Sequence, residues 1–205
     1  MESGLVGELG LGLLGRRMIH SIFALEVCMP LDPILHRALR GLIVDGTEAA
    51  SFQEKWSLYR RVADILMGHL ERVERGCWDY FDDDARALRD FDMWVKGMTT
   101  KEGARTEPSG QADPYRGTAR YMTVTMAFLL VNNSPTDLAI SSLCNIPEPD
   151  LWKRATFARI LNGLGAVSFA SVKSDTLYVI PGDDGWGLTI EDLGEPKFEY
   201  LRNVV

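Results

Sequence analysis

The sequence has few cysteines, no long apolar run and no excess of basic residues, and each absence excludes a class of protein. Its three cysteines, Cys28, Cys77 and Cys144, are far apart in the 205-residue chain. This odd, widely spaced set argues against a disulfide framework and a CxxC site, so we expect reduced thiols that are buried as small hydrophobic side chains. No stretch approaches the roughly 20 consecutive apolar residues that a membrane-spanning helix needs.

The charge balance is acidic, with 29 acidic and 22 basic residues and a net charge of −7 at pH 7. Proteins that bind nucleic acids normally carry a clustered basic surface, so the composition argues against nucleic acid as a partner. The hydrophobic content of 46% is typical of a soluble globular protein. The first residues lack the basic segment and the uninterrupted apolar stretch of a secretory signal, and we therefore expect a cytoplasmic location.

A glycine motif near the N-terminus resembles a cofactor site. Gly10, Gly12 and Gly15 have the spacing G-x-G-x-x-G. This fingerprint binds a dinucleotide only where a buried strand precedes it and a helix follows it. The nine residues before Gly10 include Gly4 and Gly7 and make a poor strand. We therefore predict no cofactor and interpret residues 1–18 as a glycine-rich leader, leaving open whether it is ordered.

The candidates for a metal site are acidic and histidine residues. The run from Asp79 to Asp84 could bind Ca²⁺ or Mg²⁺, because hard cations prefer clustered carboxylates. It lacks the spacing of a calcium-binding loop, and aspartates at the start of a helix also serve as N-caps. The chain has three histidines, which form no HExxH motif: His20, His36 and His69. We keep Asp82, Asp84 and His69 as candidate metal ligands, and we predict no catalytic residue because no nucleophile motif accompanies them.

Three helices are expected in the first half of the chain. Asp32 and Pro33 are a typical helix start, and Gly46 ends that helix. Ser51 and Glu54 have the spacing of a capping box. The longest helix follows them, and its apolar residues alternate steps of three and four: Phe52, Trp56, Tyr59, Ala63, Leu66, Leu70, Val73 and Cys77. This stripe either packs on the domain's own sheet, which we favour, or forms a coiled coil between chains. A shorter helix begins at Asp82–Asp84 and extends to Val95.

The clearest strand is Tyr121–Val131, in which every even-numbered residue is large and apolar. Its Met122-to-Leu130 face should meet the Phe52-to-Val73 stripe or a second stripe from Phe157 to Leu164. The purpose of its other face, which carries Thr123 and Thr125, is left open, and we expect a partner there if that face is exposed. Residues 21–28 are either a strand, which we favour, or the end of a helix.

The second half should contain two further helices and a hairpin. Ser134 and Pro135 begin a turn or short helix, and Glu148-Pro149-Asp150 begins a helix that ends at Gly163 or Gly165. Residues 166–172 and 176–180 are expected to be two strands joined by the short turn Lys173-Ser174-Asp175. A tight turn is expected over residues 182–185. Thr189 and Asp192 have the spacing of a capped helical turn.

These elements predict an α+β protein: a small, mostly antiparallel sheet with helices packed on one face, including one long amphipathic helix. The leader at 1–18 is followed by a helix-rich part at 19–96. A loop or linker at 97–118 precedes a strand-helix-hairpin part at 119–205. Together these parts are expected to form one folded domain. A loop of this length is usually functional or mobile.

The last part of the chain resembles a known but uncharacterised domain family. The resemblance rests on Tyr121–Leu130, the helix up to Leu164, the apolar residues Leu177–Pro181, and the ending with Thr189, Asp192 and Leu193. That family occurs in bacterial proteins and in chloroplast proteins of acclimation to fluctuating light, which are membrane-associated. The present sequence differs in lacking a transmembrane helix, and the family supplies no catalytic residues to carry over.

The missing catalytic motifs favour a non-enzymatic, regulatory cytoplasmic domain that acts through contacts with a protein partner or with a second copy of itself. Trp78, Trp94 and Trp186 are the aromatic residues expected at such a surface. The alternative is a ligand- or metal-binding protein, or an enzyme, with a pocket between the 97–118 loop and the sheet. Its first candidate residues are Asp82, Asp84, His69 and Tyr115.

Overall fold

The computed structural model describes residues 19–46, 48–49, 51–97, 117–182 and 187–205. The predictions for the leader, for the turn at residues 183–185, and for Tyr115 and Trp186 therefore lie outside the described residues, as does nearly all of the predicted loop.

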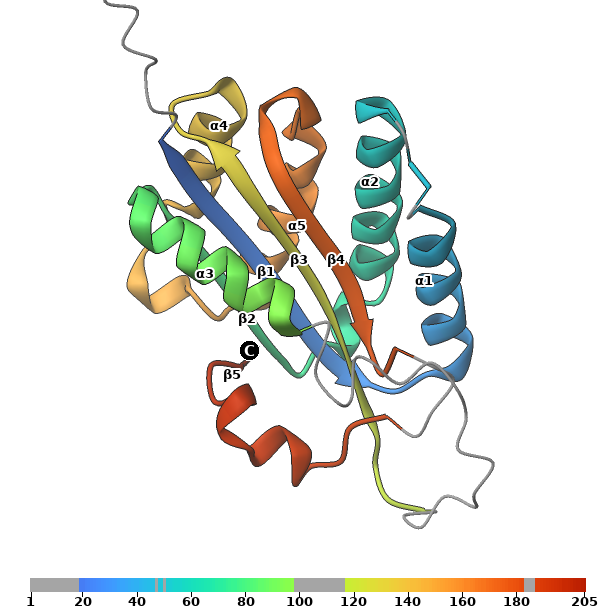
Figure 1. Cartoon of the computed structure of the whole chain (residues 1–205). Coiled ribbons are helices and arrows are strands. Elements are labelled where there is room, and N and C mark those ends of the chain that lie inside the picture. Colours follow the sequence, from blue (N-terminus) through green and yellow to red (C-terminus); the bar gives the residue numbers. More distant parts are fainter. Residues whose placement is uncertain (1–18, 47, 50, 98–116, 183–186) are drawn as a thin grey trace, which may run out of the picture.

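One antiparallel sheet of five strands, in the order β4-β3-β1-β2-β5, organises the described part of the chain (Figure 1). The strands are β1 (His20–Pro30), β2 (Arg75–Phe81), β3 (Tyr121–Val131), β4 (Val172–Ile180) and β5 (Arg202–Asn203). The helices are α1 (Pro33–Gly46), α2 (Phe52–Gly68), α3 (Asp84–Gly97), α4 (Pro135–Cys144) and α5 (Arg154–Gly163). The predicted α+β class is confirmed, and so are the strands at residues 21–28 and 121–131.

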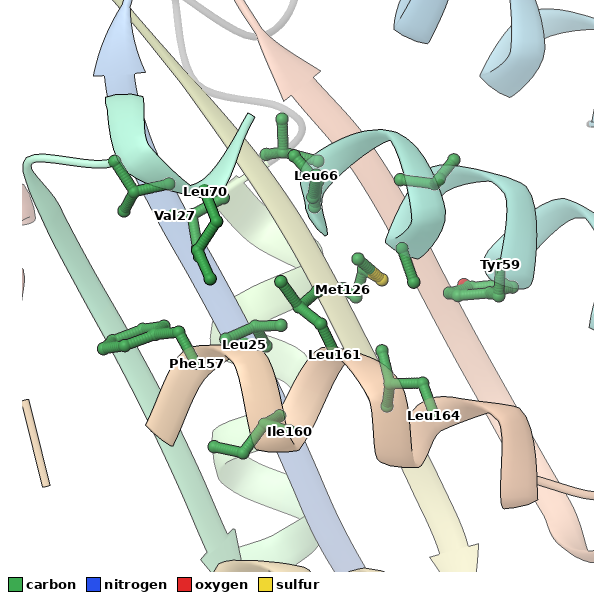
Figure 2. Packing of buried hydrophobic residues seen from close by; sticks show 14 of the residues in the cluster. Leu25, Val27, Tyr59, Leu66, Leu70, Met126, Phe157, Ile160, Leu161 and Leu164 are labelled. Carbon is green, nitrogen blue, oxygen red and sulfur yellow. The ribbon is translucent and has the colours of Figure 1, made fainter. Parts of the chain in front are cut away.

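The main hydrophobic core lies between one face of the sheet and helices α1, α2, α4 and α5 (Figure 1). The even-numbered residues of β3 from Met122 to Leu130 are all buried in it. They contact both predicted stripes, because side chains of α2 and α5 converge on the same strands. Figure 2 shows Leu161 of α5, and Leu164 directly after that helix, near Met126, with Tyr59 and Leu66 of α2 beside them.

The opposite face of the sheet is also covered. Ile22 and Ala24 of β1 pack against Ala87 and Phe91 of α3, which crosses this face (Figure 1). Further along the strands, the C-terminal segment (residues 187–205) packs Leu188, Leu193, Phe198 and Leu201 over Cys28 and Ile180. Thr123 and Thr125 are fully buried here, so the face that the sequence left unexplained is no exposed surface for a partner.

The predicted long helix from Phe52 to Cys77 is wrong in its second half. The capping box at Ser51 is present, but α2 ends at Gly68, a turn of 3₁₀ helix covers Leu70–Arg72, and β2 begins at Arg75. Gly68 is a weak helix former and Gly76 lies within β2, so neither favours a continuous helix. The apolar residues Val73 and Cys77 continued the helical spacing by coincidence.

The predicted hairpin at residues 166–180 is also wrong. Phe169–Ser171 is a 3₁₀ turn, and β4 runs without a turn through Lys173, Ser174 and Asp175. The carboxyl group of Asp175 is held by Lys55 and Tyr59 of α2, which allows a polar residue in the middle of the strand. The helix expected from Glu148 begins later, because Glu148–Asp150 is a 3₁₀ turn and α5 starts at Arg154.

A contact over Gly76 offers a test of how α5 packs on the sheet. A Cβ atom at Gly76 would lie 2.6 Å from Cε1 of the Phe157 ring and 3.1 Å from the carbonyl oxygen of Glu26. We expect Gly76→Ala to lower the free energy of unfolding by about 1–2 kcal/mol, as overpacking typically does. Urea denaturation would measure this. In a Phe157→Leu background the same substitution should cost clearly less; equal costs in the two backgrounds would contradict the contact.

Candidate functional site

A row of four residues crosses the sheet on the face that α3 and the C-terminal segment cover. Glu26 at the middle of β1 is opposite Cys77 of β2 and Thr125 of β3, and Thr125 is opposite Tyr178 of β4. Residues opposite one another in a sheet share a face. One end of this face packs under α3 and the other under the C-terminal segment. The row with Glu26 lies between these two layers.

A pocket of about 500 Å³ occupies that position. Its walls are α3, the sheet and the C-terminal segment, and aromatic side chains are prominent among them. The lining residues include Glu26, Cys77, Trp94, Tyr178, Phe198 and Tyr200. Gly97, the last residue of α3 and the last described before segment 98–116, also lines the pocket. The alternative function predicted from the sequence also places a pocket between the 97–118 loop and the sheet.

Glu26 is an acidic side chain in the middle of the sheet, with only 1% of its surface exposed. The Tyr200 hydroxyl donates a hydrogen bond of 2.8 Å to its Oε2 atom. Its Oε1 atom is buried and has no hydrogen-bond partner among the described residues. Burial raises the pKa of Glu26, and the hydrogen bond from Tyr200 acts in the opposite direction.

Two threonine hydroxyls add to the polar character beside Glu26. The hydroxyl groups of Thr123 and Thr125 are buried and make no hydrogen bond of normal geometry within the described part of the chain. They are nevertheless close enough to Glu26 to lower the pKa of its carboxyl group, against the larger effect of burial. Most buried polar atoms in proteins have a partner, so three unpartnered oxygen atoms in one region require an explanation.

The thiol and the two phenol groups that line the pocket are poor nucleophiles. Burial raises the pKa of the Cys77 thiol to about 12, and the nearby carboxyl groups of Asp79 and Glu26 act in the same direction. At neutral pH Cys77 is therefore a thiol rather than the reactive thiolate. Burial also raises the pKa of Tyr178 and of Tyr200. The arrangement is suited to binding through hydrogen bonds and apolar contact.

The structure separates the three metal candidates that the sequence suggested. His69 is the C-cap of α2, whereas Asp82 and Asp84 lie at the start of α3 on the other side of the sheet (Figure 1). Asp84 accepts hydrogen bonds from the backbone N–H of His20 and contacts its Nδ1 atom at 2.8 Å. Within the described ranges, no group of three or more His, Cys, Asp or Glu side chains could hold a metal ion.

The tryptophans expected at an exposed surface have other positions. Trp78 is half-buried, and its indole N–H donates to the carbonyl oxygen of Leu151. Trp94 is half-buried in the wall of the pocket and meets the Tyr200 ring edge-on, with 5.4 Å between the ring centroids. The three cysteines are free thiols, as expected.

The sequence analysis missed Glu26. The signal available was a single carboxylate inside an otherwise apolar strand, Ser21–Cys28, together with two threonines at alternating positions of Tyr121–Val131. A charged residue between apolar neighbours on a strand with one buried face normally points to water. Only the second covering layer, formed by α3 and the C-terminal segment, places Glu26 inside the protein.

Comparisons with known proteins add no relative to these observations. None of the helices in the described ranges is both long enough and apolar enough to cross a membrane. The chain matches no protein-family model, no curated protein and no solved structure. The resemblance to the light-acclimation domain family therefore stays a prediction from the sequence.

Proposed function

We propose that this chain is a ligand-binding domain whose pocket holds a small molecule with a mainly apolar body and one polar group directed at Glu26. The observation that carries the proposal is the unpartnered Oε1 atom of Glu26, buried beside a pocket of about 500 Å³. A buried polar atom without a hydrogen bond costs about 1–3 kcal/mol. A ligand that supplies the missing bond would recover this free energy on binding.

The size and lining of the pocket support this proposal. Sites for small molecules typically have volumes of about 300–1,000 Å³ and combine apolar walls with a few polar groups. Here Trp94, Phe198 and Tyr178 supply the walls, and Glu26 supplies the polar group. Glu26 on β1 and Tyr178 on β4 lie on either side of β3 in one sheet, which fixes their separation before a ligand arrives.

The other function expected from the sequence, contact with a protein partner or with a second copy of the chain, stays a prediction. It drew on exposed aromatic residues, and Trp78 and Trp94 are half-buried. The cytoplasmic location likewise stays a prediction. A regulatory role is compatible with ligand binding, because a ligand that fills the pocket would contact both α3 and the C-terminal segment.

Native mass spectrometry of the protein purified from its source cells tests the proposal. We expect an additional small-molecule mass on the folded wild-type chain that is absent from a Cys77→Trp variant, because the larger side chain would fill the pocket. Cys144→Trp is the matched control, since Cys144 is also a half-buried free thiol but lies outside this pocket. Retention of the same mass by both variants, or its absence from the wild type, would contradict the proposal.

A further inference from the structure

We infer that the polar group of the ligand is a positively charged nitrogen, an ammonium or amidinium group, which binds between the Glu26 carboxyl group and the aromatic walls. This inference rests on the proposed function and identifies the chemical class of its ligand. It depends on three features of the pocket: the hydrogen bonds that Glu26 makes and lacks, the acidic groups of the interior and the aromatic rings of the walls.

The first feature is that the two tyrosine hydroxyls near Glu26 already donate to other groups or to its second oxygen atom. The Tyr200 hydroxyl donates to Glu26 Oε2, and the Tyr178 hydroxyl donates to the carbonyl oxygen of Trp94 at 3.0 Å. A tyrosine hydroxyl has a single hydrogen to donate. The nearby Thr123 and Thr125 hydroxyls form no hydrogen bond of normal geometry with Glu26 either, so Oε1 is an acceptor without a donor among the described residues. The complementary ligand group is one that donates hydrogen bonds, and an ammonium or amidinium group has several.

The second feature is that the ionisable groups in the interior of the pocket are acidic rather than basic. Glu26 and Asp79 both line the pocket, and burial raises the pKa of each carboxyl group. The basic residues that line it are Lys96 and Lys197, and both are exposed at the rim. Lys197 forms an ion pair with Glu195, with 3.0 Å between Nζ and Oε2. A cationic ligand would meet the carboxyl groups of Glu26 and Asp79 inside the pocket. An anionic ligand would find the two described basic residues only at the exposed rim.

The third feature is the group of aromatic rings that line the pocket. Trp94, Tyr178, Phe198 and Tyr200 all line it. The faces of such rings attract cations, with an interaction that strengthens when water is excluded. An apolar body that carries a cationic nitrogen would satisfy both the rings and Glu26.

The ionisable groups that line the pocket with Glu26 determine how binding should depend on pH. They are Cys77 and Asp79 of β2, Tyr178 of β4, Asp90 and Lys96 of α3, and Lys197 and Tyr200 of the C-terminal segment. Asp90 is already paired with Arg86 and Arg89. A cation pairs with the ionised form of Glu26, so a proton held by this carboxyl group is released to solvent on binding. Affinity should therefore increase as the pH rises.

Isothermal titration calorimetry with three probes of the same apolar body tests the inference. The probes are 2-naphthylmethylamine as the cation, 2-naphthylmethanol as its neutral counterpart and 2-naphthoate as the anion. For the wild type at pH 8 we expect the amine to bind about tenfold more tightly than the alcohol, a difference of about 1.4 kcal/mol. The naphthoate should bind most weakly, and the advantage of the amine should shrink at pH 5.

Two variants locate the effect. Glu26→Gln should lose the advantage of the amine over the alcohol and bind the two about equally. Asp79→Asn, a second change of one carboxyl group in the same pocket, should reduce that advantage without abolishing it. Equal binding of amine and alcohol by the wild type, or tighter binding of the naphthoate, would overturn the inference and leave the proposed function in place. If none of the probes binds and no native ligand is found, both are overturned.

Discussion

Replacing Phe128 with alanine should lower the free energy of unfolding by about 3–5 kcal/mol, the usual cost of removing a fully buried aromatic ring. Phe128 has no exposed surface. Its ring centroid lies 4.8 Å from that of Tyr59 on α2, 5.8 Å from that of Phe169 and 6.1 Å from that of Phe23 on β1. The substitution would remove contacts to three separate segments at once, and urea denaturation would measure the loss.

The cavity at this position should not close easily. Phe128 lies on β3, which pairs with β1 on one side and with β4 on the other, so the strand cannot shift without breaking two sets of hydrogen bonds. Phe52→Ala is the matched control, because it makes the same substitution at a side chain that is 63% exposed. It should cost less than about 0.5 kcal/mol. Similar losses for the two variants would contradict the packing.

The position of Phe128 could be predicted from the sequence because an eleven-residue strand leaves little ambiguity. The alternation from Met122 to Leu130 spans many more residues than chance would produce, and a period of two permits one assignment. The capping signals succeeded for a related reason. Ser51 with Glu54, and Thr189 with Asp192, form bonds over three residues, so the sequence contains all that these bonds need.

The failed predictions involve segments whose structure is set by distant residues. β2 has seven residues, and it contains Gly76 because the ring of Phe157, about eighty positions away, packs directly over it. β4 continues through Asp175 because Lys55 and Tyr59 bind that carboxyl group across a separation of more than 100 residues. The sequence of a short apolar run does not reveal such distant partners, and its spacing fits a helix as well as a strand.

The candidate site could not be predicted for a related physical reason. Its polar centre, Glu26, is part of a strand that was correctly assigned, and its neighbours Thr125 and Tyr178 are also in strands. What makes the place a pocket is that α3 and the C-terminal segment cover the same face and leave a gap between them. A gap between two covering segments depends on how they pack in space, so no periodic pattern in the sequence reveals it.

Glu26→Gln should make the protein more stable at pH 8, by about 1–3 kcal/mol, the usual cost of a buried polar group without its hydrogen bond, and should change its stability little at pH 4.5. Burial raises the pKa of Glu26 above its ordinary value of 4.5, so the folded state holds this proton more tightly than the unfolded state does. Folding then takes up a proton between pH 4.5 and the folded-state pKa, and the free energy of unfolding falls as the pH rises through that window. Glutamine has no such proton and still accepts a hydrogen bond from Tyr200.

The same linkage gives Tyr200→Phe the opposite effect. The Tyr200 hydroxyl lowers the pKa of Glu26, so its removal should raise that pKa further and extend the loss of stability to higher pH. Urea denaturation of the wild type and both variants at intervals from pH 4.5 to 8 measures the three curves. The wild-type and Glu26→Gln curves should diverge from pH 4.5 upward and become parallel where the pH passes the folded-state pKa. Curves that are parallel throughout would mean that folding does not change the proton affinity of Glu26.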